Sequence, residues 1–171
     1  MRRVEINKKI KNVLFICMGN TARSPAAEYL AKGLKTKYKD DLKEVNFDSA
    51  GFFNAFSYMQ PESRNYVKSK GIDASDFRPK IINRKLLEQN ELILTMEQSH
   101  SMDIKNNYNN VKDIDTKTFT LKEFCGEIKD FDIIDPYYTS SSLYKKILKI
   151  IDNYVEKAII EIIELNKKSN S

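Results

Sequence analysis

The stretch Val13-Leu-Phe-Ile-Cys-Met-Gly-Asn-Thr-Ala-Arg-Ser-Pro25 decides the fold of this 171-residue chain. Its first four residues form a continuous apolar run, which is typical of a β-strand buried on both faces of a sheet. Ser24 and Pro25 then supply an N-cap and a residue suited to the first turn of a helix. The stretch therefore predicts a strand, a tight loop and a helix over about residues 25–37, as in alternating α/β folds.

Five residues separate Cys17 from Arg23, and this spacing suits a loop that surrounds an oxyanion. Cys17 ends the strand and so lies at the carboxyl edge of the sheet, where open α/β sheets bind ligands. Gly19 has no Cβ and lets the chain curl, so that backbone amides can point inward around one anion. The positive end of the following helix and the planar fork of Arg23 also attract a phosphoryl group. The loop is therefore predicted to bind phosphate.

Cys17 is predicted to be a nucleophile rather than a small buried hydrophobic residue. Inward amides, a helix N-terminus and a nearby guanidinium all favour the thiolate over the thiol. His100 is the only histidine in the chain, and the sequence places no partner beside it for a Cys-His dyad. The Ser24 hydroxyl can donate to the sulfur and ease its departure from a phosphocysteine. The pattern predicts a cysteine-dependent phosphatase that needs no metal or cofactor.

Asp135, in Ile133-Ile-Asp-Pro-Tyr-Tyr138, is the candidate proton donor for the leaving oxygen. Pro136 stiffens the segment that follows it. The two isoleucines before Asp135 are expected to desolvate the carboxyl partly, which favours its neutral, proton-donating form. An Asp-Pro pair alone most often marks a turn, so the catalytic interpretation depends on the cysteine loop upstream. Tyr137 and Tyr138 are expected to wall the cleft.

The chain resembles the low-molecular-weight protein tyrosine phosphatase family through two motifs in the right order. The family pattern Cys-x-Gly-Asn-x-x-Arg-Ser-Pro is matched from Cys17 to Pro25, and its downstream Asp-Pro-Tyr is matched from Asp135 to Tyr137. The likeness extends over about residues 11–165, through Asp48-Ser-Ala-Gly51, Gly71-Ile72, Leu92-Ile-Leu-Thr-Met96, Lys117-Thr-Phe-Thr-Leu121 and the final helix.

The resemblance implies a role for each matched residue. Cys17 would be the nucleophile, Arg23 the ligand of the phosphate and transition state, and Asp135 the general acid and base. Asn20, Ser24 and Ser49 would form the network that holds the loop. Substrate binding would involve the loop and two cleft walls, namely Met18, Gly19, Asn20, Thr21, Ala22, Ser24, Phe53 and Tyr137.

The choice of substrate depends on Thr21. Tyrosine phosphatases of this family usually carry a bulky aliphatic residue there, whereas bacterial relatives that act on phosphoarginine carry threonine. Tyr137 and Tyr138 resemble the tyrosine-directed members instead, so the residues give a mixed answer. Hydrolysis of phosphotyrosine in proteins is preferred, mainly because it is the commoner activity in the family, and phosphoarginine is the alternative. Phe53 belongs to an aromatic run, completed by Phe52, Phe56 and Tyr58, that forms either a cleft wall or a self-packed loop.

Other departures from the family pattern bear on regulation and on alternative functions. Ala22 stands where many members have a second cysteine, so no disulfide is expected within the loop. Asp76 lies in the region where a family histidine often supports the loop. An arsenate reductase would need paired downstream cysteines, but Cys125 is the only other cysteine. A non-catalytic phosphoprotein-binding module would be expected to lack one of the three catalytic residues, and all three are present.

Composition fits one phosphatase domain over residues 1–171, with a basic extension at 1–10 and a loose polar tail at 166–171. Two cysteines and a reactive thiolate favour the cytoplasm, and no apolar run approaches membrane-spanning length. The net charge of +5 is modest and widely spread, so the expected partner is a phosphorylated protein rather than nucleic acid or a membrane.

Four strands are predicted, at residues 13–16, 45–49, 92–96 and 116–121. Helices are predicted at about 61–70, 86–89 and 99–107, and a long amphipathic one runs through Leu143, Ile147, Ile150, Ile151, Tyr154, Ala158, Ile162 and Leu165. Right-handed crossovers make this a three-layer α/β/α fold around a four-stranded parallel sheet. The family resemblance supplies the strand order 2-1-3-4.

Overall fold

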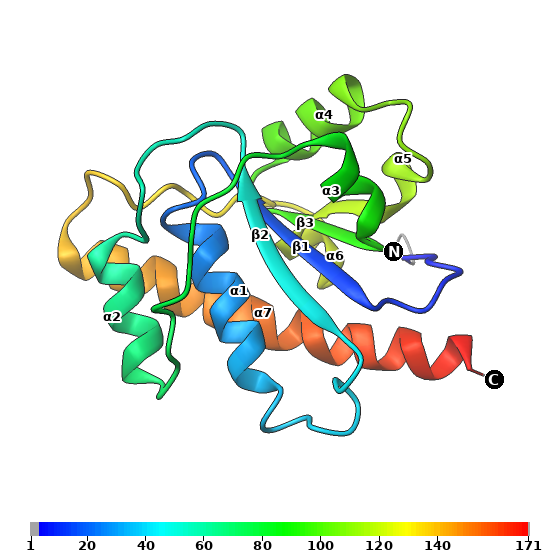
Figure 1. The fold of residues 1–171 in the computed structure, drawn as a ribbon, viewed down its shortest axis with the longest axis horizontal. Helices are drawn as coiled ribbons and strands as arrows, with labels where there is room; N and C mark the ends of the chain where they lie inside the picture. The colour runs from blue at the N-terminus through cyan, green and yellow to red at the C-terminus, as the bar shows by residue number, and fades with distance from the viewer. Residues whose placement is uncertain (1–3, 171) are drawn as a thin grey trace.

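A parallel sheet lies at the centre of the computed structural model, which describes residues 4–170 (Figure 1). The strand order is β2-β1-β3-β4, which confirms the predicted topology. The strands are β1 (Asn12–Cys17), β2 (Asn46–Gly51), β3 (Leu92–Thr95) and β4 (Thr118–Thr120). The register places Cys17 beside Gly51 and Ile16 beside Thr95, so the strands end together at one edge.

Helices cover both faces of the sheet, and the alternating side chains of β1 show which helices pack on each face. Val13, Phe15 and Cys17 face α1 and α7, with α2 and α6 on the same side, whereas Leu14 and Ile16 face α3, α4 and α5 (Figure 1). The helices are α1 (Arg23–Leu34), α2 (Pro61–Ser69), α3 (Arg84–Gln89), α4 (Gln98–Asn107), α5 (Ile114–Lys117), α6 (Leu121–Phe124) and α7 (Ser141–Ser169).

The fourth strand is shorter than predicted because a short helix flanks each end of it. Thr120 ends β4 and caps α6, accepting the Glu123 N–H while the Glu123 side chain accepts the Thr120 N–H. This reciprocal capping box releases the chain from the sheet after three strand residues. Neither α5 nor α6 was predicted, since each is only four residues long.

Helix α7 corrects two expectations. Leu143 and Ile150 were expected in the core but are 38 % and 39 % exposed. The tail from residue 166 was expected to be loose, yet α7 continues to Ser169. Asn166 is buried, donates to the Ile10 carbonyl at 2.9 Å and accepts the Ile10 N–H at 2.7 Å. Asn166 is therefore buried because its side chain supplies the hydrogen bonds that the buried backbone of Ile10 needs.

The second half of the basic N-terminal extension is held against the domain. Ile10 is fully buried, and Lys8 and Lys9 form ion pairs with Asp113 and Glu44. Residues 1–3 of the extension lie outside the described part of the chain. None of the helices in the described residues combines the length and apolarity needed to cross a bilayer.

Candidate active site

The loop from Cys17 to Arg23 connects β1 to α1, and three of its carbonyls are bonded from outside. The Met18 carbonyl accepts from the Phe52 N–H (2.8 Å), that of Thr21 from the Gln60 N–H (2.8 Å), and that of Ala22 from the Ser63 hydroxyl (2.9 Å). The described peptide bonds are all trans, so the N–H on each peptide points opposite to its carbonyl. The amides of Gly19, Ala22 and Arg23 are therefore turned away from these partners and can surround an anion.

Asn20 is the residue that bends the loop. It is fully buried and left-handed, with φ at 52°. Its Nδ2 donates to the hydroxyls of Ser24 and Ser49, each at 2.9 Å, and its Oδ1 accepts the Lys80 N–H at 3.0 Å. The structure thus brings together the three residues expected to support the loop. Asp76, in the region where a family histidine often supports the loop, accepts the Tyr29 hydroxyl instead. The loop is supported by the backbone N–H of Lys80, which donates to Asn20 Oδ1.

The glycines act differently from what the sequence suggested. Gly19 does not have a left-handed φ; a Cβ there would lie 2.7 Å from the Ala55 Cβ. Gly51 is more tightly enclosed, because its Cβ would lie 2.7 Å from the Asn20 nitrogen and 2.9 Å from the Met18 oxygen. Both glycines are therefore explained by close packing around the loop.

Ser24 does not cap the helix, which corrects that prediction. Helix α1 begins at Arg23 with Ala22 at the N-cap and no side-chain cap. The Ser24 hydroxyl lies instead 2.9 Å from Cys17 Sγ and accepts from Asn20. A hydroxyl at this distance can donate to the thiolate, which matches the second role suggested for Ser24.

A buried carboxylate lies behind the loop and was missed by the sequence reasoning. Glu28 is 3 % exposed, accepts the Ser49 hydroxyl at 2.6 Å and forms an ion pair with Lys32. Burial raises the pKa of Glu28, while the hydrogen bonds from Lys32 and Ser49 oppose that change. This chain of contacts fixes Ser49, which in turn holds Asn20.

Arg23 is held by groups from two other segments. It is 2 % exposed, and Nη1 donates to the Glu97 carboxylate and, at 2.7 Å, to the Ile133 carbonyl. Its Nη2 lies 3.7 Å from Oδ2 of Asp135. Glu97 was also missed, although it follows a predicted strand and therefore had to lie at this edge of the sheet. The geometry places a fixed guanidinium between the loop and the candidate proton donor.

Asp135 is about half exposed, and its carboxylate accepts the Tyr137 N–H at 3.0 Å. The desolvation expected from the two isoleucines is only partly present, since Ile133 is buried but Ile134 is 56 % exposed. Tyr138 is 92 % exposed and does not wall the cleft, whereas Tyr137 does. The backbone of Tyr138 is left-handed, and its ring lies against that of Tyr137, with centroids 4.0 Å apart, outside the cavity lining.

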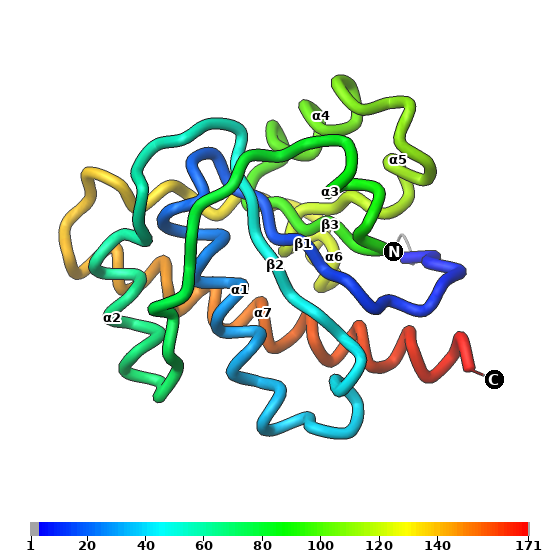
Figure 2. The backbone as a smooth tube through the Cα atoms, viewed as in Figure 1, coloured from blue at the N-terminus to red at the C-terminus, as the bar shows by residue number. Residues whose placement is uncertain are grey.

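A cavity of about 290 Å³ joins these groups. Figure 2 shows the segments that form it, the β1–α1 loop, the chain after β2 and the chain before α7, converging at one end of the molecule. Of the predicted substrate-binding residues, those that line the cavity are Met18, Gly19, Thr21, Ala22, Phe53 and Tyr137, together with the predicted catalytic Cys17, Arg23 and Asp135. Asn20 and Ser24 do not line it; both are fully buried behind the loop.

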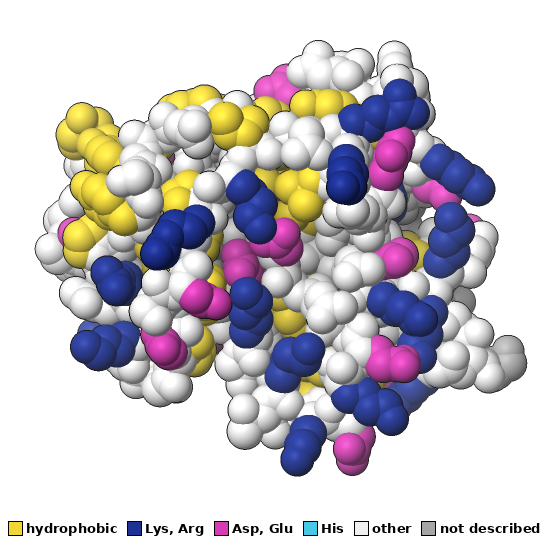
Figure 3. Space-filling model, in the orientation of Figure 1, with side chains coloured by type: hydrophobic (Ala, Val, Ile, Leu, Met, Phe, Trp, Pro, Cys, Tyr) yellow, Lys and Arg dark blue, Asp and Glu magenta, His cyan; other side chains and the backbone are white. Residues whose placement is uncertain are grey.

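Only part of the aromatic run after Gly51 forms the cleft wall. Phe53 and Phe56 line the cavity, and the Phe56 ring contacts that of Tyr137 with centroids 5.6 Å apart. Phe52 packs on His100 instead, away from the cavity lining. Figure 3 shows apolar side chains gathered at this end of the molecule, while basic and acidic side chains alternate over the remainder of the face.

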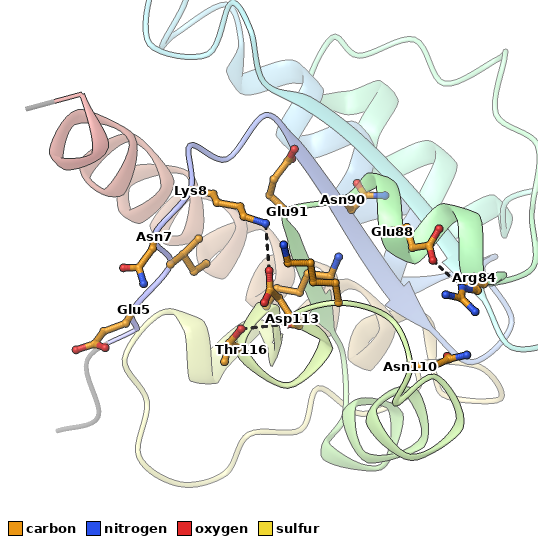
Figure 4. A pocket seen from close by; sticks show the side chains of 13 residues that line it. Glu5, Asn7, Lys8, Arg84, Glu88, Asn90, Glu91, Asn110, Asp113 and Thr116 are labelled. Carbon is orange, nitrogen blue, oxygen red and sulfur yellow. Dashed lines mark hydrogen bonds and ion pairs between the residues drawn. The ribbon is translucent and has the colours of Figure 1, made fainter.

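A larger hollow of about 630 Å³ lies at the opposite edge of the sheet, near the starts of β1, β3 and β4 (Figure 4). Its charges are largely paired, with Lys8 bound to Asp113 and Arg84 to Glu88. Lys117 donates to the Leu87 carbonyl at 2.7 Å. The hollow contains no cysteine, serine or histidine among its lining residues, so we place the chemistry in the smaller cavity.

Comparison with known proteins identifies relatives of the chain. The family model described as low molecular weight phosphotyrosine protein phosphatase matches residues 12–170. The chain is 32 % identical over 148 residues to the low molecular weight protein-tyrosine-phosphatase Ptp of Acinetobacter johnsonii, covering 86 % of this chain and 94 % of that one. It is 31 % identical over 136 residues to the protein-arginine-phosphatase of Bacillus subtilis, covering 79 % and 85 %.

The fold comparison gives the same result. The structure of the low molecular weight protein tyrosine phosphatase from T. tengcongensis superposes with a TM-score of 0.76 at 33 % identity, covering 86 % of this chain and 97 % of that one. The chain belongs to the low molecular weight phosphotyrosine protein phosphatase family.

Proposed function

We propose that this protein hydrolyses phosphotyrosine in phosphorylated proteins through a phosphocysteine intermediate. The observation that carries the proposal is the loop geometry: Cys17 Sγ lies 2.9 Å from the Ser24 hydroxyl, within a loop whose amides and whose Arg23 can hold a phosphoryl group. Asp135 reaches the same cavity from a different segment. A nucleophile, an oxyanion site and a proton donor thus share one opening.

In the first step, the Cys17 thiolate attacks phosphorus in line with the leaving oxygen. The S–P bond forms as the P–O bond to the phenol breaks, and Asp135 gives its proton to that oxygen. Arg23 and the loop amides stabilise the charge on the equatorial oxygens. In the second step Asp135 takes a proton from water, the water oxygen bonds to phosphorus, and the P–S bond breaks. The Ser24 hydroxyl stabilises the thiolate that leaves.

Two variants test these roles. Cys17→Ser should lose about 1,000-fold or more in turnover, since no other side chain supplies the nucleophile. Asp135→Ala should lose about 100- to 10,000-fold with phosphotyrosine, whose phenol has a pKa near 10 and needs a proton to leave. The loss should be smaller with p-nitrophenyl phosphate, because nitrophenolate is a better leaving group. Equal losses with both substrates would contradict the acid role.

Phosphoarginine is the second candidate substrate, and Thr21 is the observation that favours it. Thr21 lines the cavity, where a hydroxyl can accept an N–H of a guanidinium but a branched aliphatic side chain cannot. The relative from Bacillus subtilis is named a protein-arginine-phosphatase. The aromatic rings of Phe56 and Tyr137 favour the phosphotyrosine ring instead, and they support our first choice.

Hydrolysis rates of matched phosphotyrosine and phosphoarginine peptides decide between these substrates. We expect faster cleavage of the tyrosine peptide by the wild type, with Thr21→Ile raising this preference further. Cleavage of the arginine peptide alone would reverse our assignment and leave the mechanism unchanged.

We further propose a cytoplasmic location and a phosphorylated protein as the partner. A thiolate nucleophile stays active in a reducing compartment, and Ala22 gives Cys17 no neighbour for a protective disulfide. Cys125 is a poor disulfide partner for Cys17, because burial raises the pKa of the Cys125 thiol to about 12. Fractionation of the producing cells tests the location.

A further inference from the structure

Gln60 lies where helix α2 meets the loop that holds Cys17. Its backbone N–H donates to the Thr21 carbonyl at 2.8 Å, and the next residue, Pro61, begins α2. The residue is only 9 % exposed, and it lines the same cavity as Cys17 and Arg23. Gln60 is therefore part of the reaction site, although the sequence before Pro61 indicated only the start of a helix.

The side-chain amide of Gln60 has an unmet hydrogen-bonding requirement. Its Nε2 is buried, and no described residue accepts a hydrogen bond from it. Gln60 occupies the N-cap position of α2, yet its side chain makes no capping hydrogen bond. Buried donors in folded proteins are nearly always paired, because an unpaired one costs stability. A ligand that brings an acceptor into the cavity would remove this cost.

We propose that Gln60 Nε2 donates a hydrogen bond to a phosphoryl oxygen of the substrate. The inference rests on the proposed function, since it assumes that a phosphoryl group binds beside Cys17. Such a group brings anionic oxygens, which are the strongest acceptors that either candidate substrate carries into the cavity. Gln60 thereby adds a donor from α2 to the amides and guanidinium supplied by the loop and α1. The positive end of α2 adjoins the same place and favours the same charge.

The proposal predicts two effects of opposite sign. Without phosphate, the unpaired amide destabilises the folded protein, so its removal should not lower stability. With phosphate, the same amide contributes a charge-assisted hydrogen bond, so its removal should weaken binding. If Gln60 had a purely structural role, its replacement would lower the stability of the protein and leave its phosphate affinity unchanged.

The variant Gln60→Met tests this, because methionine keeps the length of the side chain and removes the donor. The matched control is Gln89→Met, the same change at an exposed position of α3 outside the cavity. Inhibition of p-nitrophenyl phosphate hydrolysis by inorganic phosphate gives the affinity, and thermal unfolding without phosphate gives the stability. We expect phosphate to bind roughly 10-fold or more weakly to Gln60→Met, with an unchanged or higher melting temperature. Gln89→Met should match the wild type in both.

Unchanged phosphate affinity in a folded Gln60→Met variant would overturn the proposal. A loss confined to phosphopeptides would also overturn it, because the acceptor would then be a peptide carbonyl. If the variant fails to fold, the side-chain amide resonance of Gln60 in the ¹⁵N-labelled wild type replaces it. That resonance should shift as phosphate is added, and a constant resonance would refute the hydrogen bond. Normal Cys17-dependent turnover alongside either negative result would leave the proposed function intact.

Discussion

Replacing Gly51 by alanine should disable the phosphate-binding loop without unfolding the protein. The added Cβ would lie 2.7 Å from the Asn20 nitrogen, 2.9 Å from the Gly19 carbonyl carbon and 2.9 Å from the Met18 oxygen. All three atoms are backbone, so no side chain can rotate away. Ordinary van der Waals contact starts at 3.4 Å, so the loop or β2 must move by about 0.7 Å (3.4 − 2.7) at the closest pair.

A displacement of this size reaches the reacting groups, because the crowded atoms belong to the backbone of the loop directly after Cys17. We expect kcat/KM for p-nitrophenyl phosphate to fall roughly 10- to 100-fold, since misplacement by 1 Å can cost about 100-fold. The unfolding free energy should fall by about 1–3 kcal/mol, as for other overpacked sites. The assay is steady-state hydrolysis combined with urea unfolding of the same preparations.

Gly71→Ala is the control for this prediction. Gly71 has a φ of +76° and nothing within 4 Å of its Cβ position, so alanine there strains the backbone but displaces no neighbour. It should lose about 1 kcal/mol of stability and keep full activity. If Gly51→Ala retained wild-type kcat/KM, the loop would tolerate the displacement, and our account of why glycine occupies this position would be wrong.

Three further predictions follow from single contacts. Ser24→Ala removes the hydroxyl 2.9 Å from Cys17 Sγ, which stabilises the thiolate that leaves, so hydrolysis of the phosphocysteine should slow about 10-fold in rapid-quench experiments; an unchanged rate would exclude this role. Asn166→Leu leaves the buried Ile10 N–H and carbonyl unpaired and should cost about 1–3 kcal/mol in urea unfolding with activity retained. Burial, with a smaller contribution from Arg23, lowers the pKa of His100 below its ordinary 6.5, so only the unfolded chain gains this proton as pH falls through 6.5. Because of this site, the unfolding free energy should be lower by up to about 1.4 kcal/mol at pH 5.5 than at pH 7.5. The variant His100→Phe should lose that part of the pH dependence.

The sequence predicted those features that depend on neighbours along the chain. The apolar run of β1, the Cys-x5-Arg spacing and the Asp-Pro pair are local patterns, and the structure places Cys17, Arg23 and Asp135 around one cavity. Strand and helix ends were less accurate, because they depend on caps and packing. Ser24 was assigned to a cap from its position before Pro25, whereas its hydroxyl is drawn to the thiol of Cys17.

The residues that sequence reasoning missed are joined to the site only by the fold. Glu97 binds Arg23 across 74 positions of sequence, and Gln60 meets the loop only because α2 packs against it. Asn166 looked like part of a solvated tail, since its polar side chain gives no sign that it pairs with the Ile10 backbone. Glutamine and asparagine are usually exposed, so the burial of Gln60 and Asn166 could be recognised only from the structure.

The contacts that hold α2 on the molecule also orient the phosphate site. The Gln60 N–H and the Ser63 hydroxyl donate to the carbonyls of Thr21 and Ala22, and each bond turns the amide of the same peptide away from α2, toward the proposed anion site. Gln60 also lines the cavity. A substitution in the first turn of α2 can therefore change the orientation of the loop amides and the contact with substrate together. Because only the side-chain contact is removed in Gln60→Met, comparison with Ser63→Ala separates these two contributions.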